Sequence, residues 1–203
     1  MLGFDGKEEI RPAYRAFREW LDRQPDQRVA RKSEQAENFF RTIGITFNVY
    51  GEDEADERLI PFDVVPRIIS GSEWRKLSKG IEQRVRAINA FMHDIYHRQE
   101  ILRSGRVPES LIANNAAFLP KMMGFDPPGG IYTHITGTDI VRTGPDQFYV
   151  LEDNARTPSG VSYMLENREI MLQMFPELFA ESPICDVSDY PTWLRRSLAA
   201  CAP

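Results

Sequence analysis

The chain has 203 residues, of which 42% are hydrophobic, enough to build one full-sized core. With 27% charged residues and 13 glycines, the composition excludes a disordered, collagenous or coiled-coil protein. The formal net charge of −5 disfavours a protein built to bind nucleic acid.

The cysteine content and the hydropathy favour a cytoplasmic protein. Cys185 and Cys201 lie far apart, and two cysteines are too few for a zinc site or a disulfide framework. No apolar run approaches the ~20 residues of a membrane span, and the N-terminus lacks the pattern of a signal peptide. We therefore expect no membrane partner.

Two helices are predicted at the N-terminus. Tyr14, Phe17 and Trp20 recur at the spacing of one helix face. A second amphipathic stretch covers residues 28–42 and ends at Gly44, a residue type that commonly follows a helix. The sequence therefore predicts a helical lead.

Alternating residues then predict a half-buried strand over residues 45–50. The acidic residues at 51–57 repel one another and indicate a solvated loop. Residues 59–69 contain two prolines, which favours an extended segment outside the centre of a sheet.

A long helical region is predicted from Ser72, interrupted near Gly80, with an apolar stripe over residues 81–102. His93 and His97 have the one-turn spacing of a helical metal pair. No third ligand follows in the sequence, so a solvated helix face is the favoured interpretation.

A β-hairpin is predicted from residues 131–143 and 147–154, which flank Gly-Pro-Asp. Proline followed by aspartate suits a type I turn. Helices are predicted over residues 161–174 and 192–200.

The hairpin carries the candidate site. The two-residue period of its second strand predicts one face shared by Phe148, Val150, Glu152 and Asn154. With two residues in the turn, Asp139 lies opposite Glu152 and points to the same face. Three oxygen ligands then converge.

Two neighbouring carboxylates repel unless a cation lies between them, and oxygen ligands favour Mg²⁺ or Mn²⁺. A three-residue turn would instead send Asp139 and Glu152 to opposite faces. A strand that merely ends in acidic residues explains the same pattern, so both interpretations stay open.

Two arginines lie near these residues in the sequence. Arg156 precedes Ser159 and Gly160 in a loop whose backbone N–H groups can face an anion. Arg142 and Arg156 suit phosphate binding beside a metal, and equally suit a salt bridge to a neighbouring carboxylate.

Glu-x-Asn followed by Pro and Gly, with an Asp on the preceding strand, resembles the metal-binding end of ATP-grasp ligases. More specifically, the chain resembles the circularly permuted ATP-grasp type 2 family, related to glutathionylspermidine-synthase-like proteins. The resemblance covers about residues 40–200. The segments that carry it are PFDVVPRII (61–69), EWRKLSKGIEQRVRAINAFMHDIY (73–96), THITGTDIVR (133–142) and VLEDNARTPSGVSYMLENRE (150–169).

The resemblance implies an α/β (α+β) fold, in which helices pack on an antiparallel sheet that contains a hairpin at about residues 131–154. We expect a single domain over residues 1–203. Within it, about 1–44 form a helical lead, 45–175 the permuted metal-binding half and 176–203 a C-terminal helical segment.

Carried over by position, the resemblance implies a metal triad and a set of ATP contacts. The metal ligands are Asp139, Glu152 and Asn154. The ATP contacts are Arg142, Arg156, Ser159 and Gly160, with Arg156 in the catalytic role. The implied cofactors are ATP and Mg²⁺, with Mn²⁺ as a substitute.

The implied reaction joins a carboxylate to an amine or thiol through an acyl phosphate. The chain stops before the LTPG-type segment expected next, so we expect an N-terminal portion whose uncovered surface promotes self-association. A non-catalytic or truncated module of the family is the main alternative. A metal-dependent nuclease is disfavoured, because Asn154 occupies the position of the nuclease lysine.

Overall fold

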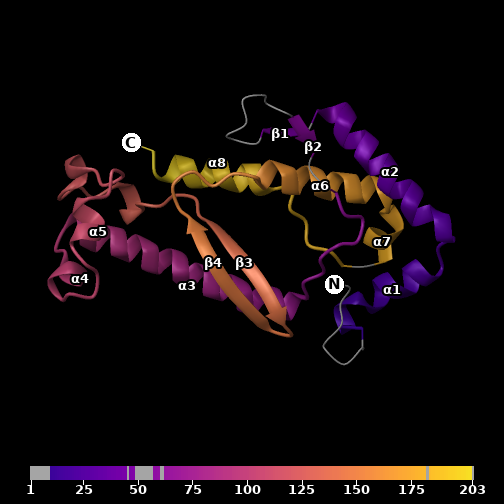
Figure 1. The fold of residues 1–203 in the computed structure, drawn as a ribbon, viewed down its shortest axis with the longest axis horizontal. Coiled ribbons are helices and arrows are strands. Elements are labelled where there is room, and N and C mark those ends of the chain that lie inside the picture. Colours follow the sequence, from indigo (N-terminus) through magenta and orange to yellow (C-terminus); the bar gives the residue numbers. More distant parts are fainter. Residues whose placement is uncertain (1–9, 45, 49–56, 60–61, 182, 203) are drawn as a thin grey trace. The chain divides into compact units, whose positions relative to one another are not determined.

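The computed structural model describes residues 10–44, 46–48, 57–59, 62–181 and 183–202 (Figure 1). The α-helices are α1 (Arg15–Asp22), α2 (Asp26–Ile43), α3 (Gly71–Tyr96), α4 (Glu100–Arg103), α5 (Ser110–Ala113), α6 (Val161–Met174), α7 (Pro176–Glu181) and α8 (Tyr190–Ala200). The strands are β1 (Thr46–Asn48), β2 (Glu57–Leu59), β3 (Gly137–Gly144) and β4 (Gln147–Asn154). Short 3-10 turns lie at Pro12–Tyr14, Pro120–Met122 and Pro128–Gly130. The expected mixture of helices and antiparallel strands is confirmed.

The chain divides into two compact units. The first unit contains Met1–Ser70 and Ser159–Ser188, and the second contains Gly71–Pro158 and Asp189–Pro203. The expected boundaries at residues 44 and 175 stay a prediction. Within the described ranges, no helix combines the length and the apolar character that crossing a membrane requires.

Aromatic residues of α1 and of the 3-10 turn before it form much of the core of the first unit. Tyr14, Phe17 and Trp20 are buried together with Val64 and Phe175. The Trp20 ring meets the Phe175 ring edge-on, with the ring centroids 5.2 Å apart. The residues with three-residue spacing therefore share one buried face, which confirms the predicted amphipathic helix.

The end of α2 follows the prediction as well. Gly44 has a φ of 72°, a left-handed conformation that glycine adopts without strain. Ala36 and Phe40 of α2 pack against Ile170 of α6, and all three are almost fully buried. The strand predicted over 45–50 is described only at Thr46–Asn48, where it pairs with β2.

The predicted acidic loop lies almost entirely outside the described residues, which resume at Glu57 in β2.

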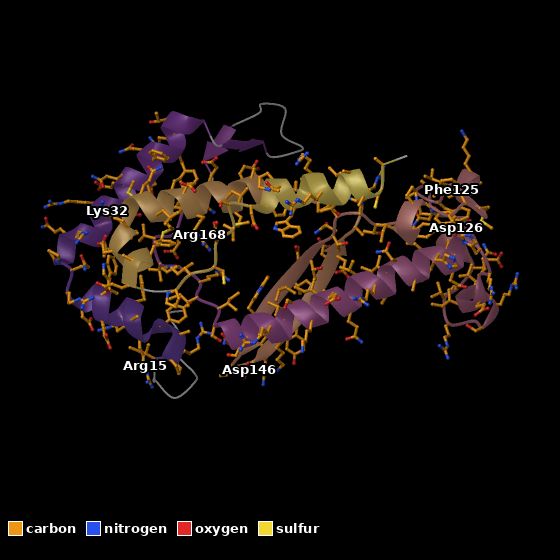
Figure 2. All side chains as sticks on the ribbon, turned by 180° about the vertical axis from the view of Figure 1, so that it is seen from behind. Arg15, Lys32, Phe125, Asp126, Asp146 and Arg168 are labelled. Atoms are coloured by element: carbon orange, nitrogen blue, oxygen red, sulfur yellow. The ribbon has the colours of Figure 1, made fainter. Side chains whose placement is uncertain are left out.

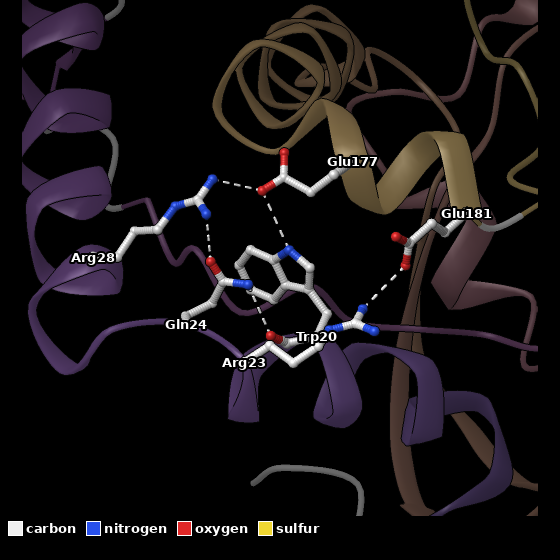
Figure 3. Close-up of polar contacts among 6 residues, drawn as sticks. All are labelled: Trp20, Arg23, Gln24, Arg28, Glu177 and Glu181. Atoms are coloured by element: carbon white, nitrogen blue, oxygen red, sulfur yellow. Dashed lines mark hydrogen bonds and ion pairs between the residues drawn. The ribbon is translucent and has the colours of Figure 1, made fainter.

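A partly buried network of side-chain hydrogen bonds joins α1, α2 and α7 (Figure 3). A carboxylate oxygen of Glu177 accepts hydrogen bonds from the Trp20 indole at 3.3 Å and from Arg28 at 2.7 Å. Burial by itself raises the pKa of Glu177. Hydrogen bonds from its own backbone N–H and from the Trp20 indole lower this pKa, and so do the positive charges of Arg28 and Lys32. These effects together outweigh burial, so the pKa of Glu177 lies below its ordinary value.

In the second unit, α3 runs without a break through Gly80, so the predicted interruption is wrong. A single helical glycine costs only about 1 kcal/mol relative to alanine, and its neighbours favour helix. The helix ends at Tyr96, and Gln99 then has a φ of 55°. Leu102 therefore belongs to α4 and not to the predicted stripe.

Strands β3 and β4 form the predicted hairpin, and Gly144 pairs with Gln147 across a two-residue turn. The φ of Asp146 is 54°, which contradicts the predicted type I turn. A type II turn requires a positive φ at this position, and aspartate tolerates one better than most residues.

The first strand starts at Gly137 and not at the predicted residue 131. The side-chain oxygen of Asn89 on α3 accepts hydrogen bonds from the backbone N–H groups of Tyr132 and Thr133. These groups are therefore satisfied by the helix and do not need a strand partner.

Candidate metal centre

One face of the hairpin packs on the first half of α3 (Figure 1). Arg142 forms an ion pair with Glu73 of α3, and its guanidinium lies 5.3 Å from the centre of the Phe148 ring. Lys76 donates a hydrogen bond to the Asp146 carbonyl at 3.1 Å. A groove of about 450 Å³ between helix and hairpin is lined by Leu77, Ile81, Arg84, Ile140, Phe148 and Val150, among others.

A β-bulge changes the alternation of side chains along β4. Ile140 pairs with Val150, whereas the preceding Asp139 pairs with Glu152, so Leu151 is an extra residue. The predicted common face of Phe148, Val150, Glu152 and Asn154 is therefore wrong. Phe148 and Val150 line the groove against α3, and Glu152 and Asn154 are exposed.

Asp153 takes the α3 side after the bulge. Its carboxylate accepts hydrogen bonds from the Arg84 Nε at 2.5 Å and from the Thr138 hydroxyl at 3.0 Å. Only 11% of the Asp153 side chain is exposed. Asp153 therefore attaches the end of the hairpin to α3.

The predicted pairing of Asp139 with Glu152 is present. Both residues are exposed, and directly opposed residues of an antiparallel pair point to the same face. The Asn154 amide donates a hydrogen bond to a Glu152 oxygen at 3.3 Å. The hairpin thus brings Asp139, Glu152 and Asn154 to one exposed face, which we call the triad face.

The donor set of the triad face suits a hard divalent cation. Two carboxylates and one amide supply only oxygen ligands, which Mg²⁺ and Mn²⁺ prefer. Among the described residues, neither Asp139 nor Glu152 forms an ion pair with a basic side chain. Within the described part of the chain, the two carboxylates therefore have no salt-bridge partner.

Gly137 is a supporting residue that the sequence patterns do not reveal. It pairs with Asn154 across the hairpin. A Cβ at Gly137 would lie 3.0 Å from the Pro158 Cβ and 3.6 Å from the Asn154 Cβ. The absence of a side chain therefore leaves room for Asn154 and for the loop that follows it.

Of the other predicted contacts, Arg142 is turned away from the triad face. Arg142 faces α3, on the side opposite Asp139, because the two residues alternate along β3. Arg156 is exposed shortly after β4. Ser159 and Gly160 belong to the first unit, where Gly160 precedes α6 with a φ of 94°. Their roles as ATP contacts stay predictions.

The chain is thus an α+β protein with a candidate divalent-metal site. The site consists of two paired carboxylates and an amide on the outer face of a hairpin that packs on α3. The chain belongs to the circularly permuted ATP-grasp type 2 family, whose model matches residues 66–203.

Several relatives match nearly the whole chain. An uncharacterized protein of Synechocystis sp. is 42% identical over 193 residues, which are 95% of this chain and 40% of that protein. An uncharacterized protein of Mycobacterium tuberculosis is 40% identical over 96% of this chain and 35% of its own length. A Frankia casuarinae protein named "Putative glutamate–cysteine ligase 2-2" is 37% identical over 98% of this chain and 23% of its own length. The chain therefore spans two-fifths or less of the length of these three relatives.

Proposed function

We propose that this chain supplies the magnesium-binding part of an ATP-dependent ligase that joins a carboxylate to an amine or thiol through an acyl phosphate. Membership of the ATP-grasp family supports the ATP dependence, and the name of the Frankia relative supports ligation. The observation that carries the proposal is the pairing of Asp139 with Glu152 on one exposed face beside Asn154.

The residues of the triad face have distinct tasks in this proposal. Asp139, Glu152 and Asn154 would hold Mg²⁺, which would supply positive charge to offset that of the ATP phosphates. Asp139 and Glu152 supply the negative charge that holds the cation, and Asn154 adds a neutral oxygen. Arg156 is exposed after β4 and is the proposed contact for the transferring phosphoryl group.

The substrate class follows from the relatives. The printed name of the Frankia protein makes glutamate and cysteine the first carboxylate and amine to test. The relation to glutathionylspermidine-synthase-like proteins and the expected self-association are kept as part of the proposal. A cytoplasmic location is also proposed, because Cys185 and Cys201 are free.

Calorimetric titration of the chain with Mg-ATP tests the proposal. We expect saturable binding that requires Mg²⁺ and weakens at least about tenfold in Glu152→Gln, because one anionic ligand is lost. Asp153→Asn is a matched control, since it removes the same charge from the next residue but on the α3 side of the hairpin. Mg-ATP affinity that is unchanged in Glu152→Gln would overturn the assignment.

A non-catalytic module of the same family is the second candidate. The ion pair of Arg142 with Glu73 favours it, because this arginine serves to hold the hairpin on α3. ADP formation with glutamate and cysteine, measured on the polypeptide as it is encoded, separates the two. The ligase forms ADP only when both substrates are present, and the module forms none.

A further inference from the structure

A second cluster of metal-binding side chains lies at the opposite end of α3 from the hairpin turn. His93 and His97 are one helical turn apart, and their rings stack with centroids 4.2 Å apart and an angle of 9° between the planes. Asp126 reaches them from the segment between the 3-10 turns Pro120–Met122 and Pro128–Gly130. Figure 2 shows Asp126 at the far end of α3 from Asp146. The sequence alone gives no sign of this third group, because it is distant along the chain.

The distances within the cluster suit a transition metal. Asp126 Oδ1 lies 3.2 Å from His97 Nε2 and 3.7 Å from His93 Nε2. One ligand atom from each of the three residues lies within 4.8 Å of the others. Metal–ligand bonds of about 2.1 Å in a tetrahedron place neighbouring ligand atoms about 3.4 Å apart, between the two measured values.

The tautomer of His97 leaves a lone pair on Nε2, 3.2 Å from Asp126 Oδ1. Its Nδ1 lies 2.9 Å from the His93 carbonyl oxygen. A carbonyl only accepts, so this Nδ1 carries the proton, and in the neutral ring Nε2 holds the lone pair. The Nε2 atom is buried and has no hydrogen-bond partner in the described residues. This backbone contact is the kind that orients histidine ligands of metals.

We propose that His93, His97 and Asp126 bind a Zn²⁺-type transition-metal ion. His97 Nε2 and an Asp126 oxygen lie 3.2 Å apart with no hydrogen bond between them, which suits joint ligation of a cation, and imidazole nitrogens select zinc over magnesium. Half of the His93 side chain is exposed, and Asp126 is more exposed still, so water can fill the remaining positions. The site shares no residue with the triad face and does not rest on the proposed function.

The expected consequence is mechanical. The metal would link Asp126 to the end of α3, and this link would close the segment of chain that contains α4 and α5 into a loop. Ligation in the folded state only would stabilise the second unit by mass action. The alternative is that His97 Nε2 carries a proton instead of binding a metal. His97 would then form a simple ion pair with Asp126.

Zinc titration against a chromophoric chelator separates these alternatives. The chain carries Cys185→Ser and Cys201→Ser, so that the two free thiols do not bind the probe. We expect one tight Zn²⁺ site per chain, with affinity at least about tenfold weaker in His93→Ala and in Asp126→Asn. His93 is exposed, so its replacement leaves the fold intact, which circular dichroism checks.

Two controls make the outcome specific. His134→Ala removes the remaining histidine of the chain and leaves zinc affinity unchanged. Glu152→Gln, on the triad face, also leaves it unchanged. Equal zinc affinity in the parent chain, His93→Ala and Asp126→Asn would overturn the proposal, and so would affinity lost on replacing His134 alone. Co²⁺ in place of Zn²⁺ should give the visible absorption of a tetrahedral site, and its absence also counts against the proposal.

Discussion

Glu152 and Asp153 are consecutive acidic residues with opposite environments. Glu152 is exposed on the triad face, whereas Asp153 is held by Arg84 and Thr138 on the side of α3. Their chemistry is nearly the same, so the backbone alone decides which carboxylate can reach a ligand in solvent. The candidate metal ligand is therefore defined by the side of the hairpin that its position faces as much as by residue type.

Glu177→Gln should destabilise the first unit by about 1 kcal/mol at neutral pH, because Arg28 and Trp20 lose a charged acceptor. The pKa of Glu177 is lowered in the folded state. Its stabilisation is therefore complete above the unfolded-state pKa of about 4.3 and is lost as the pH falls through the lower folded-state pKa. The difference between the two proteins in urea unfolding should shrink across that range.

Glu181→Gln is the matched control. Glu181 also pairs with an arginine, Arg23, but both side chains are more than half exposed, so a smaller effect is expected (Figure 3). A stability difference for Glu177→Gln that stayed constant from pH 7 to about pH 3 would contradict the assigned network.

At the scale of elements, α3 supports two different sites. Its first turns hold the hairpin through Glu73, Lys76 and Arg84. His93 in its last turn and His97 directly after it lie beside Asp126. An interruption at Gly80 would place the two sites on separate helices. Because α3 is continuous, both sites lie on the same helix.

Deletion of Leu151 should leave the triad face in place. Without the extra residue, Glu152 follows Val150 directly and still alternates to the exposed side opposite Asp139. Leu151 is 71% exposed, so its loss removes little buried surface. Mn²⁺ affinity within about threefold of the parent chain is expected. A loss comparable to that of Glu152→Gln would show that the bulge itself shapes the site.

At the scale of the whole molecule, periodicity predicted the elements well. The spacing of Tyr14, Phe17 and Trp20 identified a buried helix face, and Gly44 marked the end of α2. The pairing of Asp139 with Glu152, predicted by counting from a two-residue turn, is also present, because two register shifts between the turn and this pair offset each other. These features depend on local backbone preferences and short-range pairing, which a sequence displays directly.

The features that the sequence did not reveal depend on contacts between distant segments. The ion pair of Arg84 with Asp153 fixes which acidic residue faces α3, and nothing local distinguishes Asp153 from Glu152. Asp126 joins His93 and His97 only because the chain folds back after α5. Periodicity within one element contains no information on such approaches.

Binding of Mn²⁺ to the 203-residue chain, followed by loss of the free-ion electron paramagnetic resonance signal, tests the central claim most directly. The account predicts saturable binding that weakens at least about tenfold in Asp139→Asn and Glu152→Gln and stays within about threefold in Asp153→Asn. The reverse order, with affinity lost in Asp153→Asn and kept in Glu152→Gln, would contradict it.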